Sequence, residues 1–282
     1  MYYVLDSFIY RSVVINLEVF VVIPLFLGTF FLYNFIITKN RLTKDNSYAF
    51  LLFVVGLGCL PQLNVAYIVL VKYVILFLFL RRIYSLRTLK SVYEKLFDSG
   101  LWLGVLFLIA PENVLYLFLL FGAVLLFIKI TFRTIVIPIL GFLTPIFLVF
   151  TCHFYVDTLA NFYQLFEIRF TLDFYLYNAS FYVISIAAFG LITFIAILLK
   201  SGRIFSVSNL FKRSWILLML HLLVALSSLF LIEAKDGTEL IAILIPSTIL
   251  IANWIQSIER KIIVNIVLLL VLAISFVVHF IA

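Results

Sequence analysis

The chain has 282 residues, of which 66% are hydrophobic and 12% are charged, and its mean hydropathy is +1.27. Soluble domains have about 45–50% apolar and 25% charged residues, so this composition excludes a soluble globular protein. The formal net charge of +7 does not predict nucleic-acid binding, because the cations lie in short segments between long apolar stretches. We therefore predict an all-α, polytopic transmembrane helical bundle that forms one integral membrane domain, residues 1–282.

Ten apolar segments follow one another along the chain, separated by polar or charged turns. A full membrane crossing needs about 20 apolar residues, and fewer where polar flanks or a thinner bilayer help. Segment 100–110 is too short to cross alone, so we expect it to borrow residues from the amphipathic stretch 91–99 or to enter only part way. In chain order the segments are 13–37, 47–60, 65–80, 100–110, 114–128, 134–153, 180–199, 215–231, 240–255 and 262–282.

An alternative joins residues 100–128 into one long helix. That helix would bury Pro111, Glu112 and Asn113 near the middle of the membrane, where unpaired polar groups are costly. A hairpin that turns at these three residues avoids the cost and is preferred. Further along, Pro138 and Pro145 predict a kink in segment 134–153, because each proline removes a backbone donor.

The basic block 80–95 sets the predicted orientation. It carries five cations, and Lys and Arg stay on the cytoplasmic side because their transfer across the bilayer is costly. With ten crossings, the loops on that side hold sixteen cations and four acids, whereas the outer segments hold three cations and eight acids. This asymmetry predicts both termini on the outer face.

Two charged residues lie inside apolar segments. Glu18 is near the outer end of the first segment and Lys72 is within the third, at nearly matching depths. Intramembrane charges are rare and are usually paired. We therefore predict an intramembrane ion pair between Glu18 and Lys72 that holds two helices together. The functional alternative is a proton or ion relay.

The longest outer loop, residues 154–179, is rich in aromatic residues. Phenylalanine recurs every four residues, at Phe162, Phe166, Phe170 and Phe174, which predicts one face of a helix that lies in the outer interface. The alternative is a lid over a lipid or glycan site, in which Phe166 and Phe170 contact the substrate.

The same loop holds the candidate catalytic residues. Asp157, Glu167 and Asp173 are the acids that an enzyme at the outer face would use, and Arg169 would bind a phosphate. Arg169 and Asp173 are four residues apart, so we expect them to pair if the segment is helical.

Other reactive residues predict no site. His153 and His221 are expected to be hydrogen-bonded interior residues, and Cys59 and Cys152 are expected to pack, with a disulfide as the alternative. The chain has no P-loop, GxSxG, HExxH or GxGxxG motif and no Cys/His cluster. The sequence therefore predicts no metal and no cofactor, and it leaves open whether the protein is an enzyme.

Two resemblances are carried by short motifs. The run Leu80–Trp102, with residues 12–16 and 39–48, resembles an uncharacterised family of multi-spanning bacterial inner-membrane proteins, which implies no established activity. The small-residue run Gly100–Gly104 after a basic loop is faintly similar to membrane glycosyltransferases that use polyprenyl-linked sugars. Those enzymes carry an acidic residue in a large first outer loop, whereas residues 61–64 here contain none.

Three functions are compatible with these features. The favoured one is a non-catalytic subunit or scaffold in cell-envelope biogenesis, with membrane lipids and other membrane-protein subunits as partners. The second is a membrane enzyme that acts on a lipid-linked glycan at the outer face. The third is a small transporter or lipid flippase, suggested by Glu18, Lys72 and the proline-containing segment 134–153.

The predicted orientation is testable with single cysteines. In a background that lacks Cys59 and Cys152, we expect an impermeant thiol reagent applied to whole cells to label Asp173→Cys and not Lys90→Cys, because only residue 173 faces outward. If the reagent labels Lys90→Cys and does not label Asp173→Cys, the predicted orientation is wrong.

Overall fold

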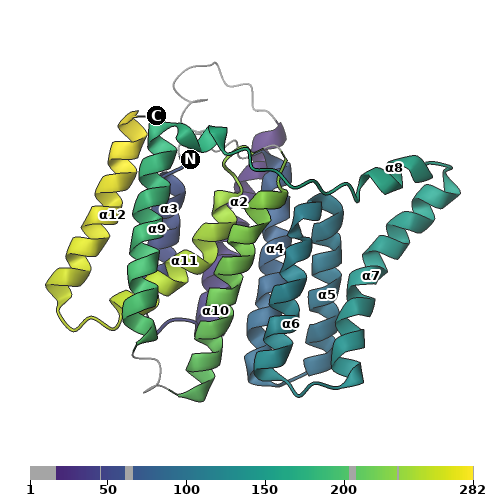
Figure 1. Cartoon of the computed structure of the whole chain (residues 1–282), viewed down its shortest axis with the longest axis horizontal. Helices are drawn as coiled ribbons and strands as arrows, with labels where there is room; N and C mark the ends of the chain where they lie inside the picture. The colour runs from purple at the N-terminus through teal and green to yellow at the C-terminus, as the bar shows by residue number, and fades with distance from the viewer. Residues whose placement is uncertain (1–16, 45, 61–65, 203–207, 234, 282) are drawn as a thin grey trace.

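The computed structural model describes residues 17–44, 46–60, 66–202, 208–233 and 235–281, with side chains from residue 20 onward (Figure 1). Within these ranges the chain forms helices and no strand, which confirms the all-α prediction. The longer helices are α2 (Leu17–Lys39), α3 (Tyr48–Gly58), α4 (Tyr67–Ser85), α5 (Val92–Ile109), α6 (Tyr116–Phe127), α7 (Phe132–Tyr155), α9 (Ser180–Ser201), α10 (Asn209–Ser228), α11 (Leu240–Ile255) and α12 (Lys261–Ile281).

Five stretches of helix are long and apolar enough to cross a membrane, so the chain is a helical membrane protein. They are Phe20–Lys39, Phe132–Tyr155, Ser180–Ser201, Asn209–Leu231 and Lys261–Ile281. The other long helices are either short, such as the 11 residues of α3, or carry several charges, as α4 and α5 do.

Each predicted apolar segment coincides with one helix, and the differences lie at the ends. Helix α5 begins at Val92, so it takes in the amphipathic stretch as expected, whereas α10 begins at Asn209, six residues before the predicted start. The single long helix 100–128 is excluded, because Ala110 has a non-helical backbone and the 3₁₀ turn η2 (Pro111–Leu115) separates α5 from α6. Residues 13–16 of the first segment lie outside the described residues.

The helices alternate in direction, so their ends gather at two ends of the bundle (Figure 1). Helices α2, α4, α6, α9 and α11 finish at one end, which we call the basic end because most cations are there. Helices α3, α5, α7 and α10 finish at the opposite end, which we call the acidic end. This arrangement follows from the charge pattern, since cations and acids that avoid the apolar interior must collect where the helices turn.

Helix α11 lies at the centre of one half of the bundle. All of its residues except Ile243 and Trp254 are buried, and it packs against α3, α9 and α10. A helix that is apolar on every side is expected to be enclosed by others. Its polar groups are satisfied within the bundle: Tyr33 Oη lies 2.6 Å from Thr248 Oγ1, and Asn253 Nδ2 donates to the carbonyl oxygen of Leu42 at 2.9 Å.

The cations of the basic block stabilise helix ends. Arg87 Nη1 donates to the carbonyl oxygen of Asn40 at 2.7 Å, just after α2, and Lys95 Nζ donates to that of Ser85, the last residue of α4, at 2.8 Å. The last carbonyl groups of a helix lack intrahelical donors and carry a partial negative charge, so a cation placed there is favourable. The block that orients the chain therefore also caps two helices.

Helices α5 and α7 approach until their backbones touch. A Cβ atom on Gly100 would overlap the carbonyl oxygen of Pro138, and one on Gly141 would overlap that of Phe97. Small residues at a helix interface allow this close approach, which is common between membrane helices. Since only Thr134, Pro138, Gly141 and Pro145 of α7 are buried, this contact holds α7 to the bundle.

Enlarging Gly141 is therefore expected to detach α7. Gly141→Leu places a side chain where the α5 backbone lies. We therefore expect the free energy of unfolding to fall by about 1–3 kcal/mol and the Tm in detergent to be lower. Gly28→Leu is the matched control, because a Cβ on Gly28 of α2 meets nothing within 4 Å. Equal melting temperatures for the two variants would show that the α5–α7 contact is not needed.

Candidate functional site

The long connection between α7 and α9 crosses the acidic end of the bundle (Figure 1). It contains the short helix α8 (Leu159–Gln164), a non-helical run over residues 167–174, and the 3₁₀ turn η3 (Tyr175–Asn178). The backbone N–H of Thr171 donates to the carbonyl oxygen of Phe230 at 2.9 Å, which fixes the run against the end of α10.

The predicted helical face of four phenylalanines is wrong, because the helix ends at Gln164. Phe162 and Phe166 pack together, with ring centroids 4.9 Å apart, and Phe166 contacts Phe107 of α5. Phe170 and Phe174 instead pack on Phe230, which follows α10. The spacing of the four phenylalanines predicted that they share one helix face. The backbone hydrogen bond of Thr171 and the ring of Phe230 instead place two of them against the segment after α10, away from the other two.

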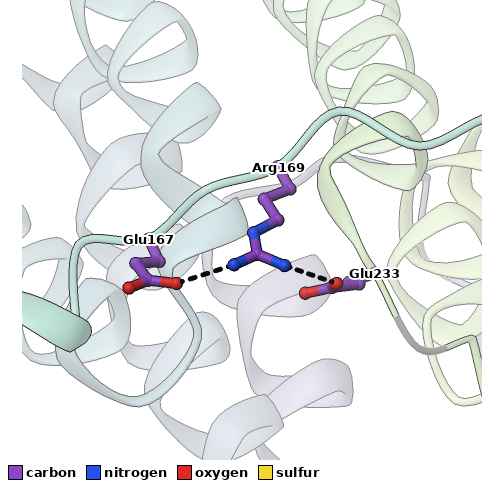
Figure 2. A network of polar contacts seen from close by, with 3 residues as sticks. All are labelled: Glu167, Arg169 and Glu233. Carbon is purple, nitrogen blue, oxygen red and sulfur yellow. Dashed lines mark hydrogen bonds and ion pairs between the residues drawn. The ribbon is translucent and has the colours of Figure 1, made fainter.

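The predicted pair between Arg169 and Asp173 is also wrong. Figure 2 shows the Arg169 guanidinium between two other carboxylates, with nitrogen–oxygen distances of 3.2 Å to Glu167 and 3.4 Å to Glu233. Pairing between residues four apart requires a helix, and this run is not helical. Arg169 therefore joins the run to the segment after α10, and its charge is already balanced by two acids.

The three candidate acids lie on the surface. Asp157 is exposed with φ at 55°, Glu167 pairs with Arg169, and Asp173 Oδ1 accepts the backbone N–H of Tyr175 at 3.0 Å. The structure does not bring them together around a cavity, so a catalytic role for them stays a prediction.

An apolar cavity of about 690 Å³ lies between α3, α9, α10 and α11. Two of its hydroxyl groups are bound to backbone: Ser185 Oγ lies 2.7 Å from the carbonyl oxygen of Phe181, and Thr193 Oγ1 donates to that of Phe189 at 2.6 Å. The remaining wall is dominated by side chains such as Ile186, Phe189, Ile197, Leu222, Leu226 and Leu244. Its volume falls within the range of about 300–1,000 Å³ that is usual for small-molecule sites.

Phe174 and Tyr177, from the long connection, line the cavity together with Leu240 at the start of α11. The Tyr177 hydroxyl donates to Glu239 Oε1, a carboxyl group that is only 4% exposed and immediately precedes α11. Burial raises the pKa of Glu239 above its ordinary value, although the hydrogen bond from Tyr177 favours the ionised form. Tyr177 therefore connects the two features: its side chain lines the cavity, and its hydroxyl group is bonded to the buried carboxyl of Glu239.

Glu239 also faces a small polar cleft. The polar residues that line the cleft are Lys72 and Tyr73 of α4, Glu112 and Asn113 of η2, Ser228 of α10, and Glu239 itself. Its volume of about 10 Å³ is at the lower limit for holding one water molecule. Asp236 lies nearby. Burial opposes its ionisation, but hydrogen bonds from Thr238 and the Lys72 charge give it a lowered pKa.

Lys72 lies closer to a helix end than the sequence suggested. It is in the second turn of α4, near the acidic end, and its Nζ lies 5.3 Å from the centroid of the Tyr73 ring. The predicted partner, Glu18, has its side chain outside the described residues. Within the described part of the chain, Glu112 and Glu239 line the cleft with Lys72, and Asp236 is close enough for the Lys72 charge to act on it.

Both interior histidines are hydrogen-bonded, as predicted. His153 Nδ1 lies 2.8 Å from Thr158 Oγ1, and His221 Nδ1 lies 2.8 Å from Tyr84 Oη. Cys59 is buried, as predicted, whereas Cys152 is exposed, so the expected packing of Cys152 is wrong. Both are free thiols, so the alternative of a disulfide is excluded. In the described ranges, no three His, Cys, Asp or Glu side chains are grouped so as to hold a metal ion.

Comparison with protein-family models, curated proteins and solved structures gives no match to this chain. The candidate site is therefore assigned from the geometry of this chain alone.

Burial of Glu239 predicts a dependence of stability on pH. The folded protein holds this proton to a higher pH than the unfolded chain does. The stability contribution is therefore complete below the ordinary glutamate pKa of about 4.3 and is lost as pH rises through the raised value. When the Tm is measured at a series of pH values above about 4.3, we expect it to fall with rising pH, and we expect Glu239→Gln to remove this fall.

Asp157→Asn provides the control, because Asp157 is an exposed carboxyl in the same end of the bundle. The proposed burial effect fails if Glu239→Gln and Asp157→Asn change the pH profile equally.

Proposed function

We propose that this chain is a multi-pass protein of the bacterial inner membrane that binds a long-chain lipid and serves as a non-catalytic subunit in cell-envelope biogenesis. The observation that carries the proposal is the apolar cavity between α9, α10 and α11, which meets polar groups at the acidic end. An apolar cavity holds water poorly and accepts an apolar chain. A lipid tail is the apolar ligand that a membrane protein meets at the highest concentration.

The proposed lipid has an anionic head group. Lys235 Nζ lies 4.7 Å from the centroid of the Phe174 ring, which lines the cavity, so a cation stands at the place where a head group would emerge. Arg169 was the sequence candidate for phosphate binding, but its two carboxylate partners leave it less suited to that role. Lys235 is therefore the residue that we assign to the head group.

We further propose that all ten helices cross or enter the membrane, with the basic end in the cytoplasm. Support comes from the alternation of the helices and from the collection of cations at one end (Figure 1). Short helices are acceptable in this arrangement where protein surrounds them, as it surrounds α11.

An enzyme that acts on a lipid-linked substrate is the second candidate, and the bond between Tyr177 and Glu239 favours it. A buried carboxyl whose pKa is raised by burial is a candidate general acid, and this one adjoins the proposed head-group position. A non-catalytic subunit, the favoured candidate, would need the bound lipid but would not need the Glu239 carboxyl group. The two candidates therefore differ in what Glu239 must do.

Blocking the cavity is expected to remove the lipid. A Cβ on Gly190, which lines the cavity, meets nothing within 4 Å, so Gly190→Phe fills open space without a clash. We expect the lipid that co-purifies with the protein in mild detergent, measured by native mass spectrometry and lipid extraction, to fall several-fold. Gly28→Phe is the matched control, because Gly28 is equally unobstructed but lies on α2 outside the cavity.

The same assay separates the two candidates when Glu239→Gln is added. A subunit should retain both lipid and complementation of a deletion strain. An enzyme should retain lipid and protein level but lose complementation. Undiminished lipid in Gly190→Phe would contradict both.

A further inference from the structure

A second polar site lies deeper in the bundle, between α4, α6 and α10. His221 and Tyr116 are 0% exposed and Tyr84 is 2% exposed. Their rings are neighbours: the centroid of His221 lies 5.7 Å from that of Tyr116 and 6.1 Å from that of Tyr84. Neither the proposed lipid cavity nor the polar cleft includes these three residues.

Two of the polar atoms in this cluster lack partners. Among the described residues, Tyr116 Oη and His221 Nε2 are fully buried and make no hydrogen bond. Buried polar side-chain atoms in folded proteins are nearly always paired with protein or with ordered water. Each of these two atoms therefore calls for a partner, and the rings that carry them are neighbours.

The hydrogen bond at Nδ1, the other ring nitrogen of His221, determines whether a partner of Nε2 must donate or accept a hydrogen bond. Tyr84 Oη lies 2.8 Å from His221 Nδ1. If Tyr84 donates this bond, its own hydrogen is used and Nε2 carries the imidazole proton. Nε2 is then a donor, as is the Tyr116 hydroxyl. A single oxygen atom with two lone pairs satisfies both donors.

The site lies within reach of the polar cleft. His221 and Ser228 are seven residues apart on α10, which places them on the same face and about 10 Å apart along the axis. Ser228 lines the cleft, and so does Asn113, three residues before Tyr116. A water molecule that entered the cleft would therefore be about 10 Å from the cluster.

We propose that a water molecule is bound between Tyr116 Oη and His221 Nε2. It accepts a hydrogen bond from each and joins Tyr84, His221 and Tyr116 into one hydrogen-bonded chain inside the bundle. The site is built for a small neutral molecule, because phenyl and phenol rings surround it: Phe79 packs edge-on against Tyr116 with centroids 5.9 Å apart.

Nuclear magnetic resonance of the histidine provides the direct test. The full chain contains three histidines, so the His153→Gln, His279→Gln background in lipid nanodiscs leaves a single ¹⁵N-labelled imidazole. We expect a cross-peak between the Nε2 proton of His221 and water, and we expect Tyr116→Phe to abolish it. Absence of the cross-peak in the Tyr116 protein would overturn the proposal.

Thermal unfolding supplies an independent readout. If water bridges the two residues, Tyr116→Phe breaks a hydrogen bond and should lower the Tm. Tyr33→Phe is the reference variant and is also expected to lower the Tm, because it removes the hydrogen bond between Tyr33 and Thr248. If the site is dry, the same change deletes an unpaired hydroxyl, and the Tm should stay the same or rise. The second result would overturn the water site, and both variants keep the shape of the ring.

Discussion

The enclosure of α11 is the constraint on which this half of the molecule depends. A 16-residue helix is about 24 Å long, shorter than the hydrocarbon layer of about 30 Å, and it avoids lipid by lying inside other helices. Its apolar side chains form one wall of the cavity, and its polar side chains tie α2 to the core through Tyr33 and Thr248. Loss of this helix would remove one wall of the cavity, the support of Glu239 and the packing of α3 and α9 against α11.

The position of Glu239 follows from the same helix. It ends the segment that leads into α11, so enclosure of the helix draws the carboxyl below the surface. Tyr177 comes from the opposite side, on a turn that the long connection holds above the cavity. A charged group would be costly at this depth without a partner, and the tyrosine hydroxyl supplies one. The site is thus an outcome of packing between distant segments, with no local motif.

Prediction from the sequence succeeded where a residue's environment is decided locally. Each apolar segment became a helix, because a long apolar run in a membrane can satisfy its backbone only internally. Prediction failed at Phe170, Phe174 and Arg169, where spacing indicated a helix that the chain does not form. Their partners, Phe230 and Glu233, are about 60 residues away in the sequence, so local periodicity carried no information about them. Glu239 is not a candidate in the sequence analysis, because burial of an acid beside a helix start has no sequence pattern.

The sequence alone determined the class of the protein, the order of its helices and the segregation of charge between their connections. These properties depend on hydrophobicity and charge, which are additive along the chain and act through the solvent rather than through specific neighbours. Only the tertiary structure decided which helix is enclosed, where a cavity remains and which polar groups share it. Those outcomes depend on side-chain shape across several helices, as Gly141 against Phe97 and Tyr177 against Glu239 show, and no single segment contains that information.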